Sequence, residues 1–184
     1  MFWVFIVLGV LVLTVLWLVL TYNGLVKSRN KVEEAWSGID VQLKRRHDLV
    51  PNLVEIVRGY AAHEREALVQ VVGARADAIA ANQPLYIERA EAKLTSALGS
   101  LTAVAEAYPE LKASESFRRL QAELAATEDE IQAARRIYNA NVRALNTRVQ
   151  SFPSVLVANV FHFGEAPYFE VDPAVTAPPV VSAD

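Results

Sequence analysis

The sequence predicts an all-α protein in which an N-terminal transmembrane helix continues into a long antiparallel, up-down bundle of about four helices. Three observations support this fold class. The first twenty residues contain no charged side chain and no proline. The rest of the chain is rich in helix formers such as Ala, Leu, Glu, Arg and Gln, and glycine is scarce, with 7 residues in 184. Apolar residues recur at helical spacing, and no strand-like alternation of period two is present.

The membrane anchor is predicted at residues 1–22. At about 1.5 Å per residue, an apolar run of this length spans roughly 30 Å, the thickness of the hydrocarbon core of a bilayer. Trp3, Trp17 and Tyr22 lie near its ends, where amphipathic rings favour the membrane interface. A cleavable signal peptide would begin with basic residues and end in a small-residue cleavage site, and this run shows neither. The lipid bilayer is therefore the first expected partner.

Basic residues follow the anchor and predict its orientation. Lys27, Arg29 and Lys31 come first, and Lys44–Arg46 come next, whereas only the α-amino group precedes the apolar run. The positive-inside rule keeps the basic side in the cytoplasm. We therefore expect the N-terminus outside and the helical domain in the cytoplasm, with the opposite orientation as the alternative.

The helical bundle is predicted at residues 23–152, and prolines divide it. The helices are expected at about 2–47, 49–80, 85–107 and 110–151. The first boundary assumes that Asp48 caps a helix with Pro51 in its first turn, where the missing N–H costs little. The alternative is that Pro51 only kinks one very long helix.

Apolar stripes on these helices predict packing seams. The clearest stripe runs in steps of three and four from Phe117 to Phe152, and similar stripes lie on the first two helices. Apolar positions that flank the stripes either widen the core or meet a neighbouring copy; they include Val26, Val54, Val57 and Ala61.

One pattern occurs at both ends of the bundle. Tyr22-Asn23 is followed by Asn30, and Tyr138-Asn139 is followed by Asn146, so each asparagine pair lies on one helix face, two turns apart. In an up-down bundle the fourth helix returns beside the first, where facing amides would fix the register. The alternative is that these asparagines are solvated.

The chain changes character after Pro153. Residues 153–171 form an apolar segment that is too short to span a bilayer, and it includes Phe161 and Phe163. We expect it either to cover the end of the bundle or to lie on the membrane surface. Residues 172–184 are proline-rich and are expected to form a disordered tail.

No catalytic or metal-binding constellation is recognisable. His63-Glu64 begins like a zinc-protease motif, but Ala67 stands where the second histidine is required. The chain has no cysteine for disulfides or thiolate metal sites, and its net charge of −3 argues against nucleic-acid binding. Lys44, Arg45 and Arg46 are expected at the membrane-distal tip of the first helix, as a contact for an acidic partner or for lipid head groups of an opposing membrane, or as a solvated helix end. We therefore expect no enzyme activity, no cofactor, no metal and no small-molecule substrate.

Two long blocks resemble the LemA family of bacterial proteins. The first is YNGLVKSRNKVEEAWSGIDVQLKRRHDLVPNLVEIVRGYAAHEREAL, and the second is ARRIYNANVRALNTRVQSFPSVLVANVFHFGEAPYFE. Together they cover about half the chain, although Leu145-Asn146 stands where the family often has a second Tyr-Asn. The resemblance implies a short anchor in the bacterial inner membrane and a helical bundle with no established enzyme activity. It also implies a partnership with membrane metalloproteases in envelope quality control, and it leaves a periplasm-facing domain as the alternative orientation.

The expected function is that of a membrane-anchored helical scaffold that works through protein–protein contacts and forms homo-oligomers. A lone anchor, long apolar seams and the lack of catalytic motifs support this expectation. Two alternatives remain. One is an adaptor for a membrane protease, with Lys44–His47 or Arg58-Gly59-Tyr60 as its contact. The other is an oligomeric protein that shapes membranes.

Overall fold

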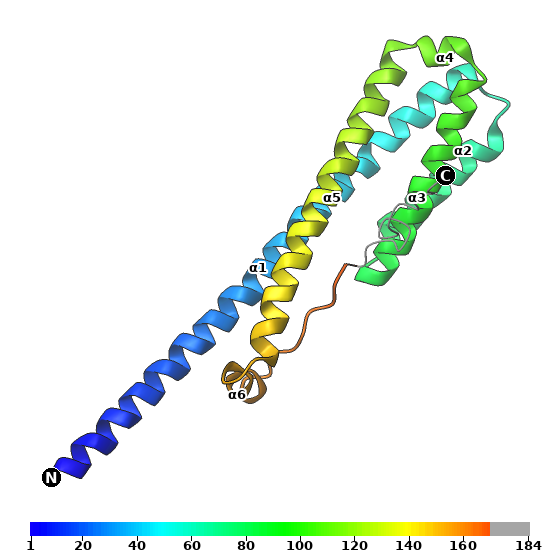
Figure 1. Ribbon diagram of the computed structural model, residues 1–184. Helices are drawn as coiled ribbons and strands as arrows, with labels where there is room; N and C mark the ends of the chain where they lie inside the picture. The colour runs from blue at the N-terminus through cyan, green and yellow to red at the C-terminus, as the bar shows by residue number, and fades with distance from the viewer. Residues whose placement is uncertain (170–184) are drawn as a thin grey trace, which may run out of the picture. The chain divides into compact units, whose positions relative to one another are not determined.

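The computed structural model describes residues 1–169, which are helical throughout except for short connections and contain no strand (Figure 1). The prediction of an all-α fold is confirmed. The segments predicted as a disordered tail, residues 172–184, and the last two residues of 153–171 lie outside the described residues. The helices are α1 (Phe2–Tyr60), α2 (Arg65–Ala80), α3 (Pro84–Glu106), α4 (Pro109–Ala113), α5 (Glu115–Gln150) and α6 (Ser154–Val160).

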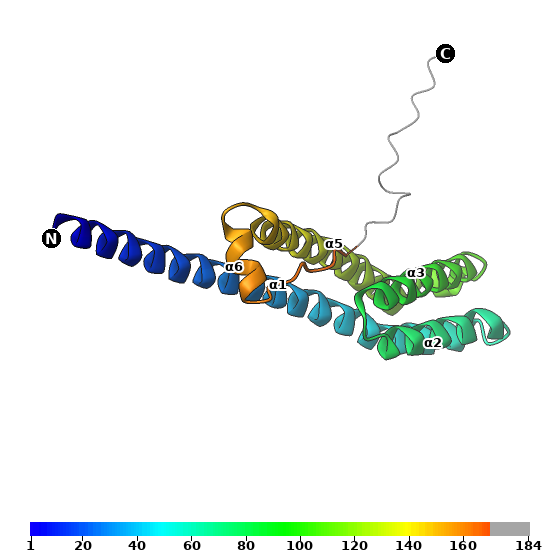
Figure 2. The same cartoon turned by 90° about the horizontal axis from the view of Figure 1, so that it is seen from below.

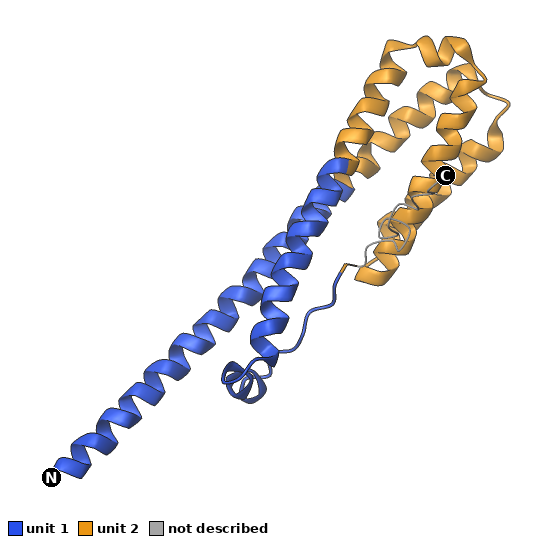
Figure 3. Cartoon of the chain, in the orientation of Figure 1, with its two compact units in different colours: residues 1–43, 129–168 blue, residues 44–128, 169–184 orange. Residues whose placement is uncertain are grey.

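The described residues divide into two compact units, coloured separately in Figure 3. Unit 1 contains Met1–Leu43 and Asp129–Tyr168, and unit 2 contains Lys44–Glu128 and Phe169. Both α1 and α5 pass from one unit into the other.

The N-terminal part of α1 carries the predicted membrane span. It is long and apolar enough to cross a bilayer, and none of its apolar window is buried in the protein. Thr14 supplies the polar side chain of the run, and its hydroxyl donates to the carbonyl of Val10 at 2.8 Å. A helix in hydrocarbon must pair its polar groups internally, and this bond does so.

Unit 1 pairs α1 with the C-terminal part of α5 in antiparallel orientation. Asn141 donates to the carbonyl of Lys31 at 3.1 Å, and Arg148 donates to the carbonyl of Gly24 at 2.8 Å. A β-carbon at Gly24 would lie 3.0 Å from the guanidinium of Arg148, so glycine allows this close approach. The buried apolar side chains of α1 recur at helical spacing, as a two-helix seam requires; they are Leu25, Val32, Ile39 and Leu43.

Unit 2 packs the end of α1, α2, α3 and the start of α5 around one apolar core, with α4 joining α3 to α5. The core takes its most buried large side chains from α1, α2, α3 and α4; they include Val50, Leu53, Val57, Val71, Leu94, Leu101 and Leu111. Each such side chain contributes about 1.5–3 kcal/mol to folding. Val54, Val57 and Ala61 belong to this core, so of the two alternatives for these flanking positions the structure shows the wider core.

The predicted boundary near residue 48 is wrong, because α1 continues through Pro51 to Tyr60. A proline inside a helix leaves the carbonyl four residues earlier without its N–H partner. That carbonyl belongs to His47, and the guanidinium of Arg75 on α2 donates to it at 2.7 Å. The interrupted hydrogen bond is thus replaced by one from a neighbouring helix, and α1 remains one long helix, as the alternative interpretation proposed.

The chain reverses direction between Tyr60 and Arg65, and the sequence did not predict this turn. The expected helix at 49–80 is therefore split between α1 and α2. No glycine or proline marks the turn at Ala61–Glu64, so the local signals for a break are missing. The reversal lets the apolar stripe of α2 face the same core as the stripe at the end of α1.

The helix predicted at 110–151 is interrupted once, at Ser114 between α4 and α5. The Ser114 hydroxyl lies 3.5 Å from the backbone nitrogen of Phe117, the position of an N-cap contact. The breaks at Pro84 and Pro109 are as predicted, since each proline occupies the first turn of its helix.

The contact between Arg75 and His47 gives a test of how α1 tolerates Pro51. We expect Arg75→Met to lower the free energy of unfolding by about 1.5–3 kcal/mol, the range for a hydrogen bond with a charged donor. In a Pro51→Ala background the restored N–H pairs with the His47 carbonyl, so the same change should cost less. Thermal unfolding of the detergent-solubilised protein, followed by circular dichroism, measures both. Equal losses in the two backgrounds would contradict this explanation.

Candidate functional site

An aromatic cluster lies at the end of the apolar span in unit 1. Tyr22 packs edge-on against Phe161, with ring centroids 4.8 Å apart, and against Phe163 at 5.7 Å. The guanidinium of Arg29 lies 5.6 Å from the centre of the Phe163 ring. In Figures 1 and 2, α6 lies beside α1 in unit 1, in agreement with these contacts. Trp3 and Trp17 are exposed on the apolar part of α1.

The segment after α6 returns along α5 and is held there by two side chains. The amide of the buried Asn146 donates to the carbonyl of Ala166 at 3.0 Å and accepts the backbone N–H of Ala166 at 2.9 Å. The hydroxyl of Tyr138 donates to the carbonyl of Pro167 at 2.9 Å, and its ring packs edge-on against Trp36. Burial raises the pKa of Tyr138 above its usual value of 10.0. We call Tyr138, Asn146 and the backbone of Ala166–Pro167 the return clasp.

The repeated Tyr-Asn segments are adjacent in unit 1, because Asn141 and Arg148 of α5 contact the backbone of Lys31 and Gly24 in α1. The amide of Asn146 is paired with Ala166 and not with an amide of α1. Asn23 and Asn30 are exposed, and Asn139 is half-buried. Two hydrogen bonds that connect α5 to α1 come from Asn141 and Arg148, each to a backbone carbonyl. Asn141 lies in the same sequence motif, two residues beyond Asn139, and no spacing in the sequence marks it as a contact residue.

A buried ion cluster lies inside unit 2. The guanidinium of Arg46 lies 2.9 Å from a carboxylate oxygen of Glu128 and 3.4 Å from one of Glu91, and it donates to the hydroxyl of Thr95 at 2.7 Å. His47 Nε2 lies 2.6 Å from the other oxygen of Glu91. Glu91 is 1% exposed and Arg46 is 5% exposed. The cluster therefore links α1, α3 and α5, with Arg46 and Glu91 removed from water and the Glu128 side chain 36% exposed.

This cluster corrects the placement of the basic segment. Lys44–Arg46 does not form the tip of a helix, because α1 continues to Tyr60. Lys44 and Arg45 are exposed on the side of α1, whereas Arg46 and His47 are buried. Glu91 was not predicted as part of any site, and a single carboxylate in an Ala-rich helix gives no pattern that would have indicated it.

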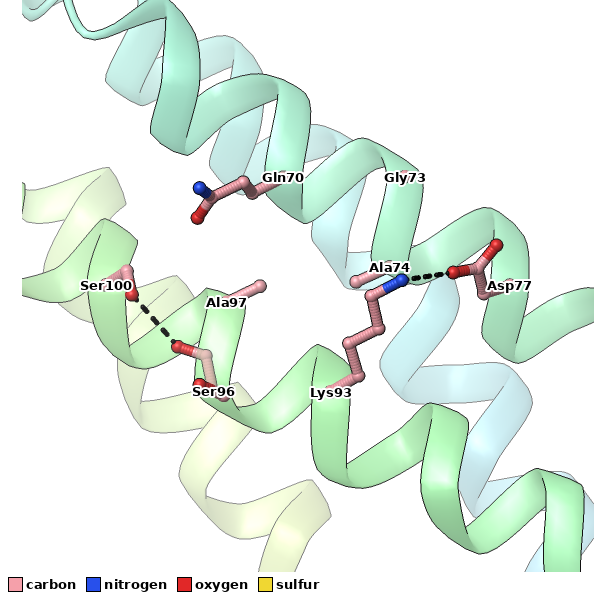
Figure 4. Close-up of a pocket in the computed structure, with 8 residues that line it drawn as sticks. All are labelled: Gln70, Gly73, Ala74, Asp77, Lys93, Ser96, Ala97 and Ser100. Carbon is pink, nitrogen blue, oxygen red and sulfur yellow. Dashed lines mark hydrogen bonds and ion pairs between the residues drawn. The ribbon is translucent and has the colours of Figure 1, made fainter.

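A groove of about 530 Å³ runs between α2 and α3 of unit 2 (Figure 4). Small side chains form its floor, and an ion pair closes one end, where Lys93 Nζ lies 2.6 Å from a carboxylate oxygen of Asp77. Both partners of this pair are more than half exposed, so water weakens their attraction. Among residues 1–169, no group of three metal-ligating side chains is gathered here or elsewhere.

The outer face of α2 is also apolar. Its inner face contributes Leu68, Val71, Ala74 and Ala78 to the core. On the outer face, Val69, Val72 and Ile79 are 70%, 50% and 53% exposed, and the exposed Ala76 lies between them. We call Val69, Val72, Ala76 and Ile79 the α2 outer stripe.

The fold and these sites define a class of protein: an all-α chain whose apolar N-terminal helix suits a membrane and continues into packed helices. Comparison with known proteins agrees. The family model described as the LemA family matches residues 35–182. The chain belongs to the LemA family, as the sequence blocks suggested.

Relatives of the chain include two proteins named magnetosome protein MamQ 1 and MamQ 2 from Paramagnetospirillum magneticum. Each is 25% identical over 187 residues, which cover 88% of this chain and 69% of the relative. A protein named LemA from Metamycoplasma hominis is 28% identical over 140 residues, covering 74% of this chain and 63% of the relative. These similarities fit a membrane-associated helical protein.

Breaking the buried ion cluster should be costly. We expect Arg46→Met to lower the free energy of unfolding by about 3–5 kcal/mol, because it leaves the buried Glu91 carboxylate without the Arg46 cation. Adding Glu91→Leu removes this carboxylate, so the double variant should lose less than the sum of the two single variants. Arg45→Met is the matched control: Arg45 is the exposed neighbour, and its loss should change stability by less than about 0.5 kcal/mol. A similar loss for Arg45→Met and Arg46→Met would contradict the cluster.

The return clasp predicts a pH-dependent contribution from Tyr138. Its raised pKa means that the folded state holds the phenol proton more tightly than the unfolded state does. This stabilisation is complete below pH 10.0 and is lost as pH rises through the folded-state pKa. Tyr138→Phe should therefore lower stability by about 0.5–1.5 kcal/mol near neutral pH, and the difference from wild type should shrink in alkaline solution. Melting temperatures over a pH series test this, with Tyr60→Phe, at an exposed tyrosine, as the control.

Proposed function

We propose that this chain is a non-enzymatic, membrane-anchored helical scaffold that acts through protein–protein contacts and associates with further copies of itself. The observation that carries the proposal is the α2 outer stripe. A surface helix normally turns polar residues to solvent, whereas α2 is apolar on both its core face and its outer face. Among the described residues of unit 2 nothing covers the second apolar face, which leaves it available to a partner.

The spacing of the α2 outer stripe favours another helix as that partner. Val69, Val72, Ala76 and Ile79 are separated by three, four and three residues. This is the spacing of a coiled-coil seam, in which side chains of one helix fit between those of the next. A flat or irregular partner surface would not require such regularity.

A second copy of the chain meets this requirement. Copies inserted in one membrane with the same topology are related by rotation about the membrane normal. A twofold rotation brings the same face of both copies together, so a self-complementary stripe on α2 is sufficient for association.

The proposed orientation places the helical domain in the cytoplasm of a bacterial cell. Lys27 and Arg29 are exposed on α1 shortly after the apolar run, where the positive-inside rule counts basic residues. A label before the span that reacts from outside the cell, with a label after the span that reacts only from the cytoplasm, would support this orientation, and the reverse pattern would contradict it.

Replacing one residue of the α2 outer stripe with a charged residue should weaken association. We expect Val72→Arg to reduce the crosslinked dimers and higher species formed in native membranes, because a buried unpaired charge opposes helix packing. Val41→Arg is the matched control, since Val41 is a 62% exposed valine of α1 outside the stripe. The measurement is crosslinking at physiological abundance followed by sizing. Only monomers in the wild type, or equal losses in both variants, would overturn the proposal.

The second candidate is the role of an adaptor for a membrane protease. Of the two segments expected to contact the protease, one remains accessible. Arg46 and His47 are buried, so Lys44–His47 cannot act as a projecting tip. Arg58, Gly59 and Tyr60 are exposed at the true end of α1 and remain accessible to a membrane protease. A wild-type chain that stays monomeric in the crosslinking experiment would favour this role.

A further inference from the structure

The connection between α5 and α6, together with α6 itself, exposes large apolar side chains that are not part of the predicted span. Phe152 is 81% exposed, Leu156 is 54%, Val160 is 70% and Phe161 is 45%. We call Phe152–Phe161 the interfacial segment. On its other side, Val157 and Ala158 are buried against unit 1. The short helix therefore has one face packed on the protein and another apolar face that no described residue of 1–169 covers.

The register of α1 against α5 places this segment at the end of the apolar span. Two hydrogen bonds between these helices join Gly24 to Arg148 and Lys31 to Asn141. The two contacts are seven positions apart on each helix. The antiparallel register is thus constant over this length. Four residues beyond Arg148, Phe152 is level with about Leu20, the last residue of the uncharged apolar run. The contact between Phe161 and Tyr22 independently gives the same level.

We propose that the interfacial segment inserts into the headgroup region of the same bilayer that the N-terminal span crosses. Phe152, Leu156 and Val160 then lie in the acyl boundary, and α6 lies in the plane of the membrane. The protein contacts lipid at two places: the span, and this second, monotopic site. The inference rests on the membrane anchoring in the proposed function.

Length and chemistry both favour lipid as the occupant. Seven residues of α6 cover only about 10 Å, so the helix cannot cross a bilayer and is suited to lie in its interface. Aromatic rings such as those of Tyr22 and Phe161 prefer this boundary. Lys27, Arg29 and Arg148 are exposed nearby in unit 1 and suit anionic headgroups. The surface is also continuous with the apolar surface of the span, which begins at the same level.

The lack of cysteine in the native sequence allows a direct test in the full chain. Single cysteines at exposed positions carry a spin label: Leu156→Cys and Val160→Cys in the interfacial segment, Leu16→Cys in the span and Ala113→Cys in unit 2. The protein is reconstituted in nanodiscs that contain anionic lipid. Collision rates with oxygen, which concentrates in lipid, and with a water-soluble nickel chelate give the environment of each label. Circular dichroism checks that every labelled variant remains folded.

The expected result is that labels at Leu156 and Val160 collide severalfold more with oxygen, relative to the nickel chelate, than the label at Ala113 does. If Leu16 reports lipid while Leu156 and Val160 match Ala113, the second lipid contact is excluded and the anchor stands. If Leu16 also reports water, the membrane anchoring of the proposed function falls, and this inference falls with it. Protection of Leu156 and Val160 from both reagents would show that protein covers the segment, which also overturns the inference.

Discussion

The hydrogen bond from Arg75 to the His47 carbonyl is the contact on which the arrangement of unit 2 depends. It replaces the bond that Pro51 removes, and α1 can therefore continue to Tyr60. Because the helix continues, Arg46 and His47 fall in its middle, where they meet Glu91. The same continuation carries Val54 and Val57 into the core. It also shortens α2 to sixteen residues, whose outer stripe is left exposed.

Two kinds of polar contact set the register of the helices, and they act differently. In unit 1, Asn141 and Arg148 each donate to a backbone carbonyl of α1 near the protein surface, and the small Gly24 allows the close approach of Arg148. In unit 2, the register depends on buried charges that must find one another. A buried ion pair is weak evidence for stability, because desolvation offsets attraction, but a shifted register would leave Glu91 unpaired. The ion cluster therefore selects one packing more than it strengthens the fold.

The sequence predicted features that depend on local composition or on the spacing along one helix. The apolar run, the helix starts at Pro84 and Pro109 and the seam of α5 from Phe117 to Val149 are of this kind. The predicted end of the seam at Phe152 is wrong, because Phe152 lies beyond α5 and is 81% exposed. The prediction of a helix boundary near Pro51 was wrong, because the donor that replaces the missing N–H is Arg75, which lies on another helix. The turn at Ala61–Glu64 was not predicted, because it uses helix-forming residues and is imposed by the core on both sides. The contact of Asn146 with Ala166 is also tertiary, since the return of the chain depends on the turn after α5.

The two proposals combine into a physical basis for the membrane-shaping alternative. In this arrangement the span would occupy both leaflets along its length, whereas the interfacial segment would add apolar volume to one leaflet only. One copy perturbs the bilayer little. Association through the α2 outer stripe would gather several such segments in the same leaflet, and the area mismatch between leaflets would grow with the number of copies. Shaping would therefore require both surfaces: loss of the stripe would disperse the segments, and loss of the segments would leave an assembly that holds the membrane without bending it.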